Sequence, residues 1–406
     1  MGNGIRLRRA RPCVVVGAGP AGLMAAEVMA RAGLSVVVHE VSASPARKFL
    51  IAGRGGLNLT HSEPIDAFLS RYGVAAERLR PAIEAFSPSA LRDWSAGLGE
   101  ETFVGSSGRV FPRSFKATPL LRAWLRRLSD LRVTLRLRRR FVGFGDGGAL
   151  RFTGPSGEES FEAGAVVFAL GGASWPRLGA DGGWVEVMRA EGIEVAPLRP
   201  ANCGFIVDWT PRLREAFAGS PLKSIALTHR DARVRGEAVV TARGIEGGAV
   251  YALSAALRES IAAEGEASLA IDFKPDMSEA ALAQRLTRKP GQSISTLLRK
   301  SAGIAPVAVA LLREAGPLPA DAAALSHRVK RCKLKLIGTA PIARAISSAG
   351  GVAWSEIDAD FMLTKRPGVF VAGEMIDWEA PTGGYLLQAS FATGAAAGRA
   401  AARWVA

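Results

Sequence analysis

The stretch between residues 12 and 40, PCVVVGAGPAGLMAAEVMARAGLSVVVHE, constrains the fold of this chain more than any other. An apolar strand, a glycine turn, a helical segment and a second apolar strand follow one another. Gly17 suits the tight turn, Gly19 lets a pyrophosphate approach the backbone, and Gly22 lets the helix pack against the strand. Glu40 ends the second strand, where it can accept the two hydroxyls of a ribose. The stretch predicts a dinucleotide-binding βαβ unit and disfavours a ribose with a 2'-phosphate.

The rest of the chain bears on which dinucleotide binds. The glycine pairs within 166–184 do not have the GxGxxG spacing, so the sequence predicts a permanent site for one dinucleotide only. NAD would require a further domain with a clear catalytic acid or base, whereas FAD would bring its own redox group. Both cofactors stay open on this argument.

Length and charge limit the classes of protein and partner. The 406 residues exceed one compact core and predict two or three domains. Lys and Arg number 52 against 37 Asp and Glu, a net charge of +15 that favours polyanions such as structured RNA. Basic stretches such as LRVTLRLRR, 131–139, also fit half-buried strands with one solvated face. A small-molecule substrate is the main expectation and RNA the alternative, and the oligomeric state is not indicated.

Cysteine usage and hydropathy concern the compartment. Cys13, Cys203 and Cys332 form no CxxC pair and no metal cluster, so we expect no metal site and a reducing, cytoplasmic location. We expect no membrane anchor, because no apolar run reaches the roughly 18 residues of a span.

Strand and helix patterns organise the remainder. Short strands with glycine turns over 132–170 predict a β-meander that leads into a buried strand. Irregular strands occupy 196–275, and Ala and Leu recur at helical spacing from 277 to about 327. The segment 366–401 has an apolar strand, a Gly-Glu turn, and a glycine pair that opens an Ala-rich helix. This repeats the strand-to-helix arrangement of an anion site.

A second glycine-rich loop, GRGGLNLTH, covers residues 53–61. It does not combine the GxGxxG spacing with a following helix and acid, so it is not predicted to be a second phosphate site. Its glycines instead allow the backbone to pass close to a flat ring. Asn58 and Thr60 can hydrogen-bond the polar edge of that ring or the turn itself.

Taken together, six blocks resemble the BaiN/RdsA-type flavoproteins, also called YhiN-like or aminoacetone-oxidase-family enzymes. The blocks are GAGPAGLMAA, RKFLIAGRGGLNLTH, VFPRSFKA, ALGGASWPRLGADGGW, SSAGGVAWSEID and GVFVAGEMIDWEAPTGGYLLQASFATG. The resemblance implies an α/β fold in which a Rossmann-like, two-dinucleotide-type FAD domain with a β-meander is interrupted by an inserted β-barrel-like domain and a small helical one. The implied bounds are 1–195 with 335–406, then 196–276 and 277–334.

This chain departs from the family pattern at three places. Gly56 and Leu57 stand where the family loop has Arg and Cys. The block 241–248 has lost a His, a Ser and a Pro and gained Glu246, and Leu386 stands where an Asn is usual. FAD binding therefore transfers more safely than any substrate.

The predicted cofactor site draws on both ends of the chain. Asp377 and the backbone around Tyr385 are implied to hold the ribityl chain and pyrimidine edge of the flavin. The full set assigned to FAD is Gly17, Gly19, Pro20, Ala21, Gly22, Glu40, Lys48, Gly53, Asn58, Leu59, Val142, Gly171, Gly172, Gly373, Glu374, Asp377, Gly383, Gly384, Tyr385 and Leu386.

Three residues are candidate proton donors, each with a plainer alternative. His61 has an ordinary pKa of about 6.5, which suits a relay, but a loop His more often caps or packs. Glu246 can act as a general acid if burial raises its pKa, or it is an exposed turn acid. Tyr251 can donate a proton or simply pack. Cys203 and Cys332 are taken as structural.

The predicted function is that of an FAD-binding oxidoreductase. The main expectation is reduction of a polarised double bond through the flavin, with NAD(P)H as a transient reductant. The wider family implies three alternatives: dihydrouridine formation in ribosomal RNA, amine oxidation, and a flavin-binding sensor without catalysis.

Overall fold

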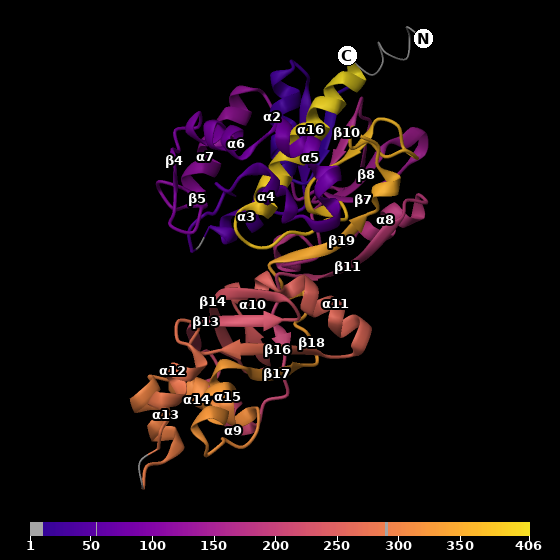
Figure 1. Ribbon diagram of the computed structural model, residues 1–406. Helices are drawn as coiled ribbons and strands as arrows, with labels where there is room; N and C mark the ends of the chain where they lie inside the picture. Colours follow the sequence, from indigo (N-terminus) through magenta and orange to yellow (C-terminus); the bar gives the residue numbers. More distant parts are fainter. Residues whose placement is uncertain (1–10, 54, 289–290) are drawn as a thin grey trace. The chain divides into compact units, whose positions relative to one another are not determined.

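The computed structural model describes residues 11–53, 55–288 and 291–406, which form two compact units (Figure 1). The first unit runs up to Arg199 and resumes over Ser347–Ala406, and the second covers Pro200–Ile346. The chain leaves the first unit along β11 (Val195–Ala201) and re-enters it at β19 (Ser347–Val352). The two ends of the sequence therefore build one unit together.

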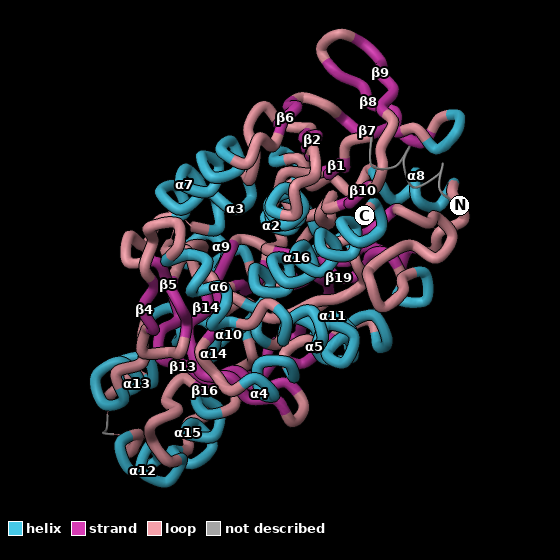
Figure 2. The backbone as a smooth tube through the Cα atoms, turned by 90° about the horizontal axis from the view of Figure 1, so that it is seen from above, coloured by secondary structure: helices cyan, strands magenta, loops and turns pink. Residues whose placement is uncertain are grey.

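A parallel sheet forms the centre of the first unit. Its strands lie in the order β20 (Val369–Val371), β10 (Val166–Phe168), β1 (Cys13–Val16), β2 (Val36–Glu40) and β6 (Thr134–Leu137). Figure 2 shows β10, β1, β2 and β6 side by side. The runs VVV and VVF are buried because helices pack on one face of the sheet and the antiparallel segment 140–161 packs on the other, where Phe141 contacts Phe168. The predicted α/β class with a Rossmann-like domain is confirmed.

Helices α2 (Pro20–Arg31) and α16 (Tyr385–Val405) lie side by side over this sheet (Figure 1). Glycines of α16 allow the close approach. A Cβ at Gly394 would lie 2.2 Å from the carbonyl oxygen of Ala21, and one at Gly398 would lie 2.8 Å from that of Ala25. The small residues in the C-terminal block therefore serve helix packing directly above the nucleotide-binding turn.

Smaller sheets and helices surround the parallel sheet. The meander β7 (Arg140–Phe144), β8 (Leu150–Gly154) and β9 (Gly157–Phe161) is antiparallel. The sequence pattern predicts the meander over 132–170, but the first strand of that range, β6, instead pairs in parallel with β2. A third sheet joins β3 (Thr60–His61), β5 (Arg109–Pro112) and β4 (Thr102–Val104). The other helices of the unit are α3 (Arg47–Ala52), α4 (Ile65–Ser70), α5 (Ala76–Ala85), α6 (Pro88–Ala96), α7 (Ala117–Asp130) and α8 (Trp184–Ala190), with short turns η1 (Gly73–Ala75), η2 (Asp146–Gly148), η3 (Pro176–Leu178), η5 (Trp354–Glu356) and η6 (Gly373–Met375).

The second unit is a barrel-like sheet with helices. Its strand order is β17 (Cys332–Leu336), β16 (Ala267–Asp272), β13 (Pro221–His229), β14 (Ala232–Thr241), β15 (Gly244–Glu246), β12 (Phe205–Ile206) and β18 (Gly338–Thr339). Only Ile337 separates β17 from β18, so the first and last strands are joined and the sheet curls toward closure. Its helices are α9 (Pro211–Phe217), α10 (Gly248–Ala252), α11 (Ser254–Glu264), α12 (Glu279–Arg285), α13 (Ile294–Ala302), α14 (Pro306–Glu314), α15 (Ala322–Lys330) and the short η4 (Ile342–Arg344).

Barrel and helices of the second unit share one hydrophobic core, to which Leu227, Leu269, Leu298 and Leu311 all contribute. Both predicted parts, 196–276 and 277–334, fill the same interior. Their division into two domains therefore stays a prediction. None of the helices among the described residues is long and apolar enough to cross a bilayer.

Candidate functional site

A pocket opens in the first unit at the carboxyl ends of β1, β2 and β10, the edge where parallel sheets of this kind bind ligands. Eleven of the residues that line it belong to the predicted dinucleotide site or directly precede one of its residues in the chain: Val16, Gly17, Gly19, Pro20, Ala21, Glu40, Lys48, Gly171, Ala372, Gly373 and Glu374. They come from five separate segments of the sequence. The fold brings these segments to one place.

The glycine turn is shaped as the motif requires. Gly17 has a φ of +106°, and a Cβ there would lie 2.3 Å from the carbonyl oxygen of Ala169. A Cβ at Gly22 would lie 1.9 Å from the carbonyl oxygen of Gly17. At Gly19, which precedes the first turn of α2, a Cβ would meet no protein atom within 4 Å. The turn is therefore closed against the protein at two glycines and open toward the pocket at the third.

Glu40 is held at the pocket by two backbone amides. Its Oε2 accepts a hydrogen bond of 2.8 Å from Ala18 N–H, and its Oε1 accepts one of 2.8 Å from Ser42 N–H. Each carboxylate oxygen retains a further lone pair. The side chain is therefore fixed in place and still able to accept hydroxyl donors.

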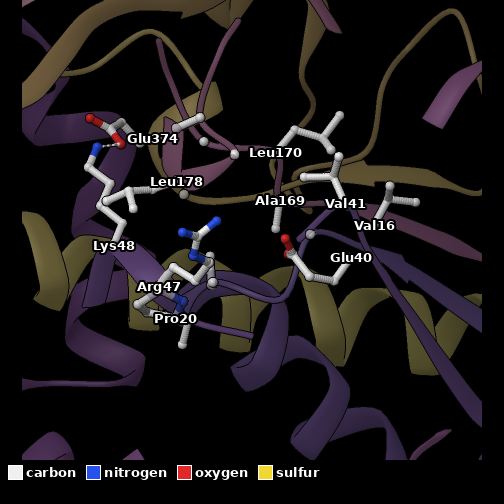
Figure 3. A pocket seen from close by; sticks show the side chains of 18 of the residues that line it. Val16, Pro20, Glu40, Val41, Arg47, Lys48, Ala169, Leu170, Leu178 and Glu374 are labelled. Carbon is white, nitrogen blue, oxygen red and sulfur yellow. Dashed lines mark hydrogen bonds and ion pairs between the residues drawn. The ribbon is translucent and has the colours of Figure 1, made fainter. Parts of the chain in front are cut away.

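Lys48 and Glu374 form an ion pair of 2.7 Å on the side of the pocket away from Glu40 (Figure 3). Lys48 Nζ also donates to Ser174 Oγ at 2.6 Å, and Glu374 Oε1 accepts Ser348 N–H at 2.8 Å. The pair joins α3 to η6, so it ties the N-terminal segment to the C-terminal one. It places one positive and one negative group where a nucleotide would run.

Sequence reasoning missed several charged residues of the pocket. Arg47, at the start of α3, lies beside Pro20 in Figure 3, and its NH1 donates to the carbonyl of Arg177 at 3.2 Å. No carboxylate partner is found for it in the described part of the chain. Arg139 and Arg140 also line the pocket, and Arg140 pairs with Asp181 at 2.8 Å. The alternation in 131–139 had suggested solvated arginines and could not indicate that the stretch turns back toward β2.

His39 is a buried ring without hydrogen-bond partners among the described residues. It stacks on Phe152 with ring centroids 4.0 Å apart. Burial, together with the smaller effect of the charges of Arg136 and Arg139, lowers the pKa of His39 to about 4. The ring is therefore neutral at physiological pH and packs the meander against β2.

The second glycine loop extends from the pocket toward the start of α16. A Cβ at Gly384 would lie 2.5 Å from the Cα of Thr60, so loop and helix meet backbone to backbone. Asn58 Oδ1 and Thr60 Oγ1 are buried and have no partner in the described structure. Buried acceptors without donors are uncommon and indicate a ligand or water. The loop thus fits the polar edge of a flat ring.

The remaining predicted cofactor residues belong to the same unit. A Cβ at Gly172 would lie 2.4 Å from Ser348 Oγ, and burial raises the pKa of Asp377 against an opposing effect of Arg199. The pocket lining does not include Gly22, Gly53, Asn58, Leu59, Val142, Gly172, Asp377, Gly383, Gly384, Tyr385 and Leu386. Their contact with a cofactor stays a prediction.

His61 follows this loop on β3. Its Nδ1 accepts a hydrogen bond from Glu63 N–H at 3.2 Å, and its Nε2 lies 3.0 Å from the carbonyl oxygen of Ser107. These partners fit a neutral ring with its proton on Nε2. The ring also stacks 5.5 Å from that of Tyr385. Both nitrogens are engaged with backbone, so a proton relay through His61 remains a prediction.

Glu246 and Tyr251 belong to the second unit, on β15 and α10. Burial, together with the smaller effect of the nearby Glu246, raises the pKa of Tyr251 to about 12. The phenol therefore keeps its proton at neutral pH, as a donor must. The structure brings these two residues together, and their catalytic role stays a prediction.

The described residues contain no group of three or more His, Cys, Asp and Glu side chains that could hold a metal ion. The cysteines Cys13, Cys203 and Cys332 are free and buried, and burial raises the thiol pKa of Cys13 to about 11.

Comparisons with known proteins agree with this arrangement. The family model of the HI0933-like protein Rossmann domain matches residues 11–400. A 3-dehydro-bile acid delta(4,6)-reductase of Clostridium scindens is 28% identical, with 96% of this chain and 98% of that protein aligned. A ribosomal RNA dihydrouridine synthase of Escherichia coli is 25% identical, with 92% and 94% aligned.

A solved structure shares the fold. The 3-ketosteroid delta1-dehydrogenase of Sterolibacterium denitrificans superposes with a TM-score of 0.54 at 13% identity, covering 97% of this chain and 99% of that one. At this level of identity the likeness concerns architecture alone.

Proposed function

The chain belongs to the HI0933-like Rossmann-domain family and is an FAD-dependent oxidoreductase, and we propose that it reduces a polarised double bond of a small molecule with NAD(P)H. The observation that carries the cofactor is the pocket at the carboxyl edge of the parallel sheet. It combines an open glycine turn with a fixed ribose acceptor, and the second glycine loop, outside its lining, adds buried acceptors without partners among the described residues. The relative from Clostridium scindens, a reductase of a bile acid, supports the substrate class.

Different residues are proposed to bind different parts of the cofactor. Glu40 is proposed to accept the ribose hydroxyls, and the first turn of α2 and Arg47 to bind the pyrophosphate. Lys48 and Glu374 would lie along the ribityl chain, and Asn58 at the pyrimidine edge. The chemistry that FAD supplies when bound is two-electron hydride exchange. In the proposed reaction, reduced nicotinamide is oxidised, and a double bond conjugated to a carbonyl gains hydride at its β-carbon and a proton at its α-carbon.

The ribose assignment predicts the effect of Glu40→Gln. An amide would present a donor to Ala18 N–H or Ser42 N–H and would lose the charge-assisted bonds to the hydroxyls, so FAD should bind roughly tenfold more weakly or worse. Fluorescence titration of FAD-free protein measures this. Glu158→Gln on the exposed meander hairpin is the control and should bind FAD as the wild type does. Equal affinity in both variants would refute the ribose contact.

Anaerobic photometry tests the reductase proposal. The FAD-loaded protein is mixed with NADH and, separately, with NADPH, and the visible flavin absorbance is followed. We expect rapid bleaching with one of them, followed by recovery on addition of a conjugated steroid ketone without oxygen. Bleaching without recovery would reject this substrate class. A flavin that neither nucleotide bleaches would instead favour an oxidase or a sensor.

Reduction of a base in structured RNA is a second candidate, favoured by the net charge of +15 and by the likeness to the dihydrouridine synthase. RNA binding through phosphates should weaken steeply with salt. Mapping dihydrouridine in ribosomal RNA from a deletion strain by reverse-transcription stops decides the matter. An unchanged map would remove this candidate.

A further inference from the structure

Tyr385, the first residue of α16, forms two hydrogen bonds with the segment that contains α4. Its hydroxyl donates to Glu63 Oε1 at 2.6 Å, and its backbone carbonyl accepts the hydroxyl of Tyr72 at 2.8 Å. Glu63 precedes α4, and Tyr72 follows it. The two ends of one short segment therefore converge on one residue that is more than 300 positions away in the sequence.

Arg71 completes this arrangement, which we call the Tyr385 clamp: Glu63, Arg71 and Tyr72 around Tyr385. Arg71 Nε donates to Glu63 Oε1 at 3.1 Å and its NH2 to Oε2 at 2.7 Å, a bidentate pair. The Glu63 side chain is 12% exposed, and Tyr385 and Tyr72 are buried. Burial works to raise the pKa of Glu63, but hydrogen bonds from Arg71 and Tyr385 outweigh it and the pKa is lowered. The carboxylate is thus ionised, and both of its oxygens accept hydrogen bonds.

The clamp acts on the glycine pair that precedes α16. Gly383 and Gly384 have φ of +137° and +99°, conformations that glycine adopts readily because it has no side chain. The turn therefore has no side chains of its own to hold it in place. The ring of Tyr385 lies against the first of them, because a Cβ on Gly383 would be 2.8 Å from its Cε2. On its other side, the turn meets Thr60 of the second glycine loop. The Tyr385 ring therefore supports the turn on the side opposite Thr60.

We propose that Glu63 is a positioning residue that, through Tyr385, holds the Gly383–Gly384 turn in the geometry that FAD requires. The inference rests on the proposed cofactor site. Neither Glu63 nor Arg71 touches the nucleotide pocket, so the effect is indirect. Loss of Glu63 should therefore change the rigidity of the turn and the environment of the bound flavin, as well as the affinity for FAD.

The test uses the full-length protein and four variants. Glu63→Ala removes the acceptor, Tyr385→Phe removes only the donor, their double variant closes a thermodynamic cycle, and Glu63→Gln keeps two acceptor lone pairs without the charge. Glu77→Ala, in an exposed ion pair with Arg80 on α5, is the matched control. For each variant we would measure FAD affinity, the visible circular dichroism of the flavin at saturating FAD, and hydrogen exchange of the FAD-free protein over 383–388.

We expect Glu63→Ala to weaken FAD binding about tenfold, as for loss of a charged hydrogen bond. Amides of 383–388 should exchange faster while those of β1 stay protected, and the flavin dichroism should change. The double variant should be no weaker than Glu63→Ala, and Glu63→Gln should recover much of the loss. Additive losses, or unchanged affinity and exchange, would overturn the proposal.

The same data separate this inference from the proposed function. A wild type that binds FAD beside unaffected variants would reject the clamp alone. A wild type that binds no FAD would reject the cofactor site, and the positioning role with it. Faster exchange in Glu63→Ala would then report a purely structural contact.

Discussion

Gly19→Val should weaken FAD binding roughly a hundredfold, about 2.7 kcal/mol, while leaving the FAD-free protein as stable as the wild type. Gly19 has φ −82° and ψ −177°, an extended conformation that valine adopts readily. A Cβ there meets no protein atom within 4 Å and would enter the space that we assign to the pyrophosphate. The substitution should therefore lower the affinity for FAD without lowering the stability of the FAD-free protein.

Gly22→Ala is the contrasting variant on the same turn. Its Cβ would overlap the carbonyl of Gly17, so we expect the FAD-free protein itself to lose roughly 1–3 kcal/mol of stability. Titration with FAD and urea unfolding of FAD-free protein distinguish the two. If Gly19→Val bound FAD normally, the pyrophosphate would not lie on this turn.

Glu27→Ala should destabilise the first unit by about 3–5 kcal/mol, the usual cost of removing one partner of a buried ion pair. Glu27 lies on α2 and is 2% exposed. Its Oε2 accepts Trp124 Nε1 at 2.8 Å and Trp94 Nε1 at 3.1 Å, and its Oε1 pairs with Arg127 at 3.2 Å. Its Oε1 also accepts from Arg31 at 2.9 Å, so alanine would leave two indole donors and two guanidinium groups without this acceptor.

Urea unfolding of FAD-free protein, followed by tryptophan fluorescence, measures that loss. Glu186→Ala, from an exposed i,i+3 pair with Arg189, is the control and should change stability by less than about 0.5 kcal/mol. Equal midpoints for the two variants would show that Glu27 does not hold α2 to α6 and α7. Such a result would also remove the reason for an acid in an otherwise apolar helix.

The sequence was informative where function depends on local spacing. The turn at Gly17 and the acid at Glu40 lie on one continuous βαβ unit, so their geometry follows from 28 neighbouring residues, 13–40. The place of the C-terminal segment came from resemblance, because no local pattern shows that Gly394 must pack on Ala21. Here the close backbone approach explains the small residues only after the helices are seen together.

Contacts between distant segments could not be predicted. Nothing around Glu63 or Arg71 indicates that both act on Tyr385, and nothing in α2 shows that two tryptophans donate to Glu27. The pattern of 131–139 predicts a strand with a solvated arginine face, yet Arg139 lines the pocket, because the pattern does not show the break between β6 and β7. Polar contacts between segments that are distant in the sequence produce no periodic pattern from which they could be predicted.

The most direct test of the central claim is the cofactor content of the purified protein. The protein is incubated with FAD, freed of excess nucleotide and denatured, and the released compound is identified by mass and quantified against protein. We expect one FAD per chain and a flavin absorption spectrum before denaturation. A protein that retains no FAD, or that retains NAD in its place, would contradict it.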